Sequence, residues 1–153
     1  MNPSLYYTLI SLHILGACIW TGGHLVLAVS VLPRAWREKR SDLIRAFEGP
    51  YERIGIPALG VQIVTGIWLA WHLLGAPSHW LVASPAAHAV QFKLILLALT
   101  AAFALNARLR VIPNLRDDNI PVLGFHIISV TTLGVLFVLT GIALRFGGFP
   151  FFS

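Results

Sequence analysis

Charged side chains are scarce in this sequence, and acidic ones are absent from its long apolar runs. Charged residues make up 11% of the 153 residues, 57% are hydrophobic and the mean hydropathy is +0.78. An ordinary soluble domain has about 25% charged residues, so this composition excludes that class. All six acidic residues lie in connections between the runs, which excludes the carboxylate relay of a proton pump. No nucleophile is placed against a histidine within the runs, which argues against a hydrolase.

Cysteine and methionine are almost absent too. The single cysteine, Cys18, excludes an internal disulfide, and Met1 is the only methionine. The first seven residues carry no lysine or arginine, and the apolar run that follows is too long for the core of a signal peptide. We therefore expect this first run to remain in the protein as a helix.

Four apolar runs cover most of the chain. They lie near residues 5–32, 54–74, 87–107 and 121–144. Each reaches the ~20 residues that a helix needs to cross ~30 Å of hydrocarbon, and the connections between them are short. They predict an all-α integral membrane protein, a single transmembrane domain over residues 1–153 folded as an up-and-down four-helix bundle.

Nine of the eleven basic residues lie in two of the three connections, whereas residues 75–86 carry no charge. The basic residues are Arg34, Arg37, Lys39, Arg40, Arg45 and Arg53 in the first connection, and Arg108, Arg110 and Arg116 in the third. The positive-inside rule places both connections in the cytoplasm and both termini outside, as in a multi-pass protein of a bacterial-type inner membrane. Acidic neighbours dilute the basic patch, which argues against binding of phosphate or lipid head groups there. We expect no nucleic-acid partner, and membrane lipid is expected as a partner because the chain spans the membrane. Glycine-rich helix faces favour a homodimer, although the sequence leaves the oligomeric state open.

Four histidines lie inside the apolar stretches, where a charged group costs about 2.5 to 3.5 kcal/mol and needs a partner. His13 and His24 are separated by about 20° of residual rotation and roughly 16 Å of rise, so they share one face of the first helix. Counting from the helix ends pairs His13 with His72 in the outer half and His24 with His126 in the inner half. The histidines therefore predict two stacked ligand sites, although the pairing depends on depth alone.

Paired imidazoles from facing helices are the axial iron ligands of b-type cytochromes, so these histidines predict one or two haem b groups. Trp20 lies on the stripe between His13 and His24, and Trp68 lies on the face of His72. The predicted function is a membrane cytochrome that transfers electrons between a quinol or redox protein and an acceptor. Copper bound by the same imidazoles is the alternative, although the sulfur atoms of Met1 and Cys18 lie off the histidine stripe.

Two further cations lie in or beside the apolar runs. Lys93 is about six residues into the third run, near the depth of His13. Its ammonium can snorkel to outer water, pair with a haem propionate or replace His72 as an axial ligand. Arg145, near the outer end of the last run, has the same option of a propionate partner.

Several short motifs follow one another in the order of a known superfamily. They are Leu12-His13, Ile19-Trp20-Thr21-Gly22-Gly23 and Pro33-Arg34, then Arg53, Thr65-Gly66 and Trp68-Leu69, and finally Phe92-Lys93-Leu94 with Asn106, Arg108 and Pro113. This order resembles the CopD-like membrane proteins and HemJ, the haem-containing protoporphyrinogen oxidase. The resemblance covers most of the chain and is weak in the last helix.

The resemblance implies two further functions. Similarity to HemJ implies that His13 and Lys93 take the positions of its functional histidine and lysine, which support one haem and porphyrinogen oxidation. Similarity to CopD implies a copper-binding or copper-transport role at the inner membrane, beside a periplasmic copper carrier. His24, His72 and His126 are additions to both patterns. Because a second haem needs such additions, we favour a cytochrome branch of this superfamily over either named activity.

Overall fold

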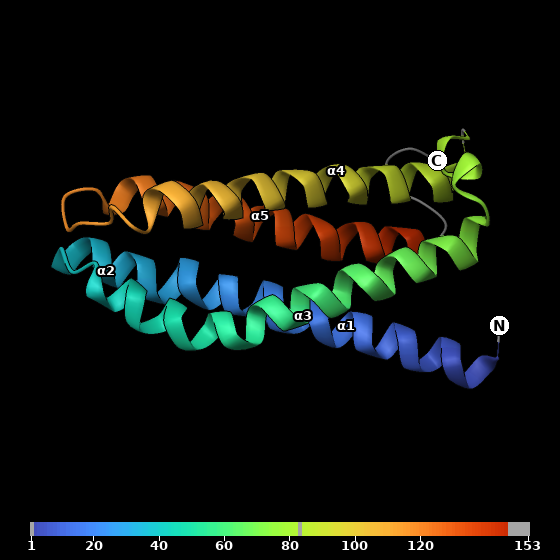
Figure 1. Ribbon diagram of the computed structural model, residues 1–153, viewed down its shortest axis with the longest axis horizontal. Coiled ribbons are helices and arrows are strands. Elements are labelled where there is room, and N and C mark those ends of the chain that lie inside the picture. Colours follow the sequence, from blue (N-terminus) through green and yellow to red (C-terminus); the bar gives the residue numbers. More distant parts are fainter. Residues whose placement is uncertain (1, 83, 147–153) are drawn as a thin grey trace.

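The computed structural model describes residues 2–82 and 84–146, and these form one helical bundle (Figure 1). Its elements are α1 (Pro3–Val26), η1 (Leu27–Val31), α2 (Leu32–Glu38), α3 (Asp42–Leu74), η2 (Pro77–Leu81), α4 (Pro85–Asn106), η3 (Ala107–Val111) and α5 (Ile120–Arg145). The segments η1 and η3 are π-helical and continue the helices that precede them, whereas η2 is a short 3₁₀ helix.

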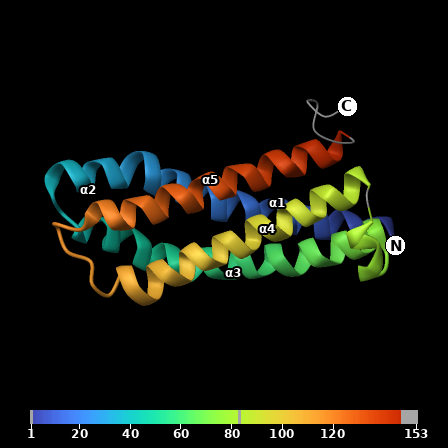
Figure 2. The same ribbon diagram turned by 90° about the horizontal axis from the view of Figure 1, so that it is seen from above.

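Four helical spans are long and apolar enough to cross a membrane: Pro3–Glu38, Asp42–Leu74, Pro85–Val111 and Ile120–Arg145. Successive spans run in opposite directions along the long axis, as Figures 1 and 2 show. The predicted all-α, up-and-down membrane bundle is therefore confirmed. We call the end formed by α2, η3 and residues 112–119 the basic end, and the end formed by η2 and the start of α1 the terminal end.

The helices extend further toward the basic end than the apolar runs predicted. The second run was expected to begin near residue 54, but α3 begins at Asp42 and continues through Pro50 and Pro57. The true turn between the first two spans is only residues 39–41, where Lys39 takes a left-handed conformation with φ 52°. The prediction was short because it followed hydropathy, whereas a helix that leaves the hydrocarbon can continue with charged side chains in water.

The bundle consists of two hairpins. Helix α1 packs most extensively against α3, and α4 packs most extensively against α5. The contact between α1 and α5 joins the two pairs, while α3 and α4 touch little (Figure 1). Thr21 Oγ1 on α1 donates to Gly134 O on α5 at 3.5 Å, and Thr131 Oγ1 on α5 donates to His24 O at 3.1 Å. These bonds fix the level of α5 relative to α1.

The surface is largely apolar, and the interior contains hydroxyl groups. Large hydrophobic side chains are exposed along all four spans, which suits helices whose outer surface contacts lipid. Five threonines are buried: Thr21, Thr65, Thr100, Thr131 and Thr140. The main cluster of buried aliphatic residues, including Leu27, Ile44 and Leu123, lies toward the basic end. The hydroxyl groups of the buried threonines therefore face the bundle interior, whereas the outer surface is largely apolar.

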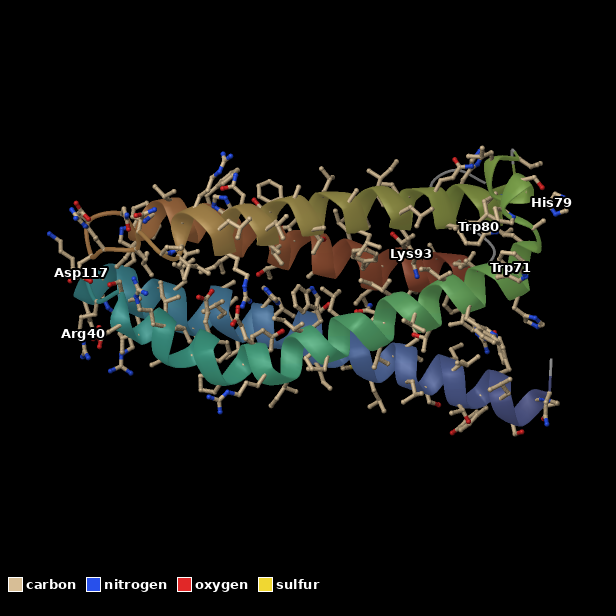
Figure 3. The ribbon with its side chains drawn as sticks, in the orientation of Figure 1. Arg40, Trp71, His79, Trp80, Lys93 and Asp117 are labelled. Carbon is tan, nitrogen blue, oxygen red and sulfur yellow. The ribbon has the colours of Figure 1, made fainter. Side chains whose placement is uncertain are left out.

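At the basic end, side chains join the first connection, which contains Arg40, to the third connection, which contains Asp117 (Figure 3). Ser41 donates to Asp117 Oδ1 from its backbone N at 2.8 Å and from Oγ at 2.6 Å. Arg45 Nη2 donates to Leu115 O at 2.8 Å. The hydrogen bonds from Ser41 hold the pKa of the exposed Asp117 carboxyl below its ordinary value. These bonds join the two hairpins outside the apolar zone.

The Asp117 link predicts a pH-dependent stability. Because the pKa of Asp117 is lower in the folded chain, its contribution is fully present above the unfolded value of about 3.9 and disappears as pH falls through the lowered folded value. We expect Asp117→Asn to unfold at a lower temperature than the wild type at pH 7, and the difference to close in acid, once the pH has fallen through the lowered pKa of Asp117. Circular dichroism in detergent measures both midpoints.

The matched control is Asp118→Asn, because the neighbouring Asp118 is exposed and makes no hydrogen bond in the described part of the chain. This variant should unfold with the wild type at both pH values. A deficit in Asp117→Asn that stays undiminished in acid would contradict the electrostatic origin of the link.

Candidate functional site

A cavity of about 300 Å³ lies in the basic half of the bundle, between the two hairpins. Its walls are mostly apolar and come from all four spans. The lining includes Trp20, His24, Glu48, Tyr51, Glu52, Gly55, Ala104, Arg108, Leu123, His126 and Ile127. Small-molecule and ion sites typically have this form, an apolar chamber with a few polar groups. Two of the histidines that the sequence singled out, His24 and His126, therefore line the same cavity.

His24 is held at the deeper part of the cavity by two aromatic rings. Its Nδ1 lies 2.9 Å from Trp20 O and 3.2 Å from Tyr51 Oη, and its ring centroid is 4.4 Å from that of Trp20. A carbonyl oxygen only accepts, so Nδ1 carries the proton of the neutral ring and donates it. The lone pair is therefore on Nε2, which is the state that a metal-binding imidazole requires.

His126 repeats this arrangement on α5. Its Nδ1 lies 2.9 Å from Val122 O, and the rings of Phe103 and Phe125 meet it edge-on at 5.8 Å. The same donor argument leaves the lone pair of His126 on Nε2. Both histidines thus use their own helix to fix the tautomer, which is the second-shell arrangement typical of metal ligands.

The two imidazoles lie at different levels. Thr131, which bonds to His24 O, is five residues beyond His126, so His126 is about 7 to 8 Å nearer the basic end. Each ring bonds a carbonyl four residues earlier and therefore leans toward the start of its own helix, in opposite directions for α1 and α5. His24 and His126 are thus placed at successive levels along the cavity. Their pairing on one haem iron stays a prediction.

Tyr51 crosses from α3 to α1 because glycines leave room for its ring. A Cβ at Gly23 would lie 2.1 Å from Tyr51 Cε2, and one at Gly55 would lie 2.9 Å from Tyr51 Cζ. The hydroxyl donates to Trp20 O at 2.8 Å. The ring thereby supports the carbonyl that orients His24. Of the Gly22-Gly23 pair, Gly23 is therefore the glycine that the close approach of the Tyr51 ring requires.

Three charged side chains, Glu48, Glu52 and Arg108, line the part of the cavity that opens to the exterior. Glu48 and Glu52 are one turn apart on α3, and Arg108 is on η3. Arg108 and Glu52 form an ion pair across the two hairpins, with side chains 54% and 42% exposed although both line the cavity. We call these three residues the mouth site.

A second set of polar side chains, His13, Thr65 and Lys93, lies toward the terminal end. His13 Nδ1 is 3.0 Å from Thr65 Oγ1, which itself donates to Val61 O at 2.6 Å, so the hydroxyl accepts from the ring. Lys93 interacts with His13 electrostatically and directs its ammonium inward, to 3.4 Å from the Cβ position of Gly141 on α5 (Figure 3). The structure thus brings together His13 and Lys93, the pair that the sequence resemblance to HemJ implied.

The other residues that the sequence predicted for the site lie outside the cavity and outside the set formed by His13, Thr65 and Lys93. His72 is exposed, and its ring faces Tyr6 at 6.2 Å, whereas His13 is level with Thr65, about 10 Å nearer the basic end. Trp68 is 54% exposed, and Arg145 is exposed at the end of α5. Cys18 is exposed, and Met1 lies outside the described residues. The structure does not bring His72 to His13, because depth counts ignore how far two antiparallel helices are shifted.

The sequence interpretation missed Tyr51, Glu48 and Glu52. All three fell in the stretch taken as an interfacial connection, although Leu43, Ile44 and Phe47 there already had helical spacing. Tyr51 continues that spacing, and its ring stacks on Phe47 at 5.6 Å. Extending the apolar stripe by one turn would have found Tyr51.

The possible metal donors of the cavity include the imidazoles of His24 and His126 and the carboxylates of Glu48 and Glu52. No group of three or more His, Cys, Asp or Glu side chains within residues 2–82 and 84–146 is placed to hold a metal ion. The cavity instead offers two neutral imidazoles within mostly apolar walls. Imidazole ligates both copper and haem iron, so His24 and His126 are donors that either group could use.

The family model described as Copper resistance protein D matches residues 45–145, which covers nearly all of α3 and the whole of α4 and α5. The matched region contains the mouth site, Tyr51 and His126, whereas His24 lies before it. No curated protein and no solved structure matches the chain.

Proposed function

The chain belongs to the CopD family and is a multi-pass membrane protein, and from this premise we propose that it binds monovalent copper in the cavity of its basic half. The observation that carries the proposal is the pair of cavity imidazoles, His24 and His126, with Nδ1 bonded to a carbonyl and Nε2 free. Imidazole is a good copper ligand, and copper is here the cargo of the protein.

His24 is the holding ligand in this proposal. The indole of Trp20 is 4.4 Å from the His24 ring between centroids, so an aromatic ring lies close to a cation bound at His24. The apolar walls exclude water from this site. His126 lies nearer the basic end and acts as the receiving ligand. The absence of a three-ligand cluster among the described residues suits a cargo that must later leave.

His13 is left out of the copper site for an electrostatic reason. The ammonium of Lys93 acts on His13, and a charged lysine in a low-dielectric interior repels a second cation. We therefore assign copper to the basic half alone. By the positive-inside rule, the basic end faces the cytoplasm of a bacterial-type inner membrane.

Haem b is the second candidate, because the cavity is larger and more apolar than a single ion requires. His24 would ligate the iron, with Trp20 and Tyr51 beside it and Arg108 available to a propionate. When bound, haem would supply one-electron transfer to a quinol or redox protein. The HemJ-like oxidase activity is a further form of this candidate and would use His13 with Lys93.

Composition of the purified protein tests the proposal. We expect one Cu(I) per chain after anaerobic loading and removal of loosely bound metal, measured by mass spectrometry of the metal, and no porphyrin band in the visible spectrum. A reduced haem band without copper would replace the copper assignment by the haem one. A protein that takes up neither group would overturn both.

A further inference from the structure

The two cavity imidazoles differ in one hydrogen-bond partner, a tyrosine hydroxyl. Tyr51 Oη comes from α3 and lies 3.2 Å from His24 Nδ1. Nδ1 of His126 bonds only to Val122 O, on its own helix, among the described residues. We propose that the Tyr51 hydroxyl is a positioning group that makes His24 the tighter of the two copper ligands. This inference rests on the proposed copper function and names the residue that sets its affinity.

The direction of each hydrogen bond follows from the groups involved. The Tyr51 hydroxyl has one proton and donates it to Trp20 O at 2.8 Å, its shortest contact. His24 Nδ1 also donates to Trp20 O, at 2.9 Å, since a carbonyl oxygen only accepts. The oxygen of Tyr51 keeps its lone pairs and accepts the Nδ1 proton as a second partner. Nδ1 carries this proton in the neutral and in the charged ring, so the arrangement does not depend on the ionisation of His24.

The second acceptor has two effects on His24. A hydrogen bond from the far ring nitrogen raises the basicity of a histidine that ligates a metal, and His24 has two such acceptors where His126 has one. The two acceptors also lie on different helices, so the His24 ring cannot rotate without losing one of the bonds. Basicity and orientation therefore both favour Nε2 of His24 as the stronger donor.

Packing of the Tyr51 ring fixes the position of its hydroxyl. The ring lies against Gly23 and Gly55, where a Cβ would come within 2.1 and 2.9 Å of its atoms, and it stacks on Phe47 at 5.6 Å. It bridges α3 and α1, the two helices that pack most extensively against each other. A phenylalanine at residue 51 would keep these ring contacts and remove the hydroxyl alone. Tyr51→Phe therefore isolates the hydrogen bond.

Tyr51→Phe is expected to weaken Cu(I) binding about tenfold, since loss of an outer partner of a metal ligand costs 10- to 100-fold. Anaerobic competition with a chromophoric Cu(I) chelator measures the affinity of the detergent-solubilised full chain. Tyr7→Phe is the matched control, because Tyr7 is 73% exposed and makes no hydrogen bond through its hydroxyl in the described part of the chain. Equal affinities of Tyr51→Phe and the wild type would overturn the role of the hydroxyl.

A double-mutant cycle distinguishes positioning from a general effect on the fold. In a His24→Ala chain, Tyr51→Phe should cause no further loss of Cu(I) affinity, because the hydroxyl acts through that imidazole. The same tenfold loss with and without His24 would overturn the positioning role, since the hydroxyl would then act through the structure of the bundle.

Nuclear magnetic resonance of the copper-free chain tests the hydrogen bond by itself. The Nδ1–H proton signal of His24, identified by its loss in His24→Ala, should move upfield in Tyr51→Phe and stay in place in Tyr7→Phe. An unmoved signal in Tyr51→Phe would overturn the bond from Nδ1 to the hydroxyl. A wild type that shows this bond and yet takes up no copper would overturn the proposed function rather than the hydrogen bond.

Discussion

Replacing His24 by alanine is expected to weaken Cu(I) binding by about 100-fold or more, since loss of a mere second-shell partner already costs 10- to 100-fold. The substitution removes the imidazole whose ring lies 4.4 Å from the ring of Trp20 and 5.5 Å from the ring of Tyr51. The affinity is measured by anaerobic competition with a chromophoric Cu(I) chelator. His126→Ala should have a smaller effect on affinity and a larger one on the rate of loading.

Substitutions at two other histidines test whether the loss of affinity is specific to His24. His88→Ala is the matched control, because His88 is exposed on α4 and does not line the cavity. His13→Ala distinguishes the two polar groups, since His13 bonds to Thr65 and lies beside Lys93. We expect both variants to keep the wild-type affinity. Loss of binding in His13→Ala with normal binding in His24→Ala would move the site to the terminal half.

The four spans were predictable because a bilayer imposes one simple condition, a helix of about 20 apolar residues, that hydropathy alone detects. The same condition explains the error at α3. No continuous apolar run marks the stretch from Asp42 to Arg53, which continues the helix past the hydrocarbon zone. Its amphipathic spacing was visible at Phe47, and the structure continues the helix through Pro50 and Pro57.

The candidate site was predictable only in part. Depth placed His24 and His126 in the same half, and both line one cavity. Depth could not give the lean of each ring, because that lean is set by a bond to the carbonyl four residues earlier. It also could not give the shift between α1 and α3, which puts His72 beside Tyr6 and His13 beside Thr65. Contacts across helices decide both features.

Replacing Gly16 by alanine is expected to destabilise the bundle, although alanine is ordinarily the better helix residue by about 1 kcal/mol. A Cβ at this position would lie 2.9 Å from the backbone oxygen of Ala58 and 3.2 Å from Gln62 Cβ. Because the obstacle is backbone, no rotamer relieves it, and α1 must move away from α3. Overpacking of this kind costs about 1 to 3 kcal/mol.

The matched control is the same substitution at Gly22, where a Cβ would meet no atom within 4 Å. There the helix preference acts alone, so Gly22→Ala should be neutral or stabilising, and the two variants should differ by about 2 kcal/mol. Unfolding in a denaturing detergent, followed by circular dichroism, measures the difference. Equal stability of the two variants would mean that α1 and α3 are not in close backbone contact at Gly16. Such contact also sets the level at which His24 meets Tyr51, so Gly16→Ala should weaken copper binding as well as the bundle.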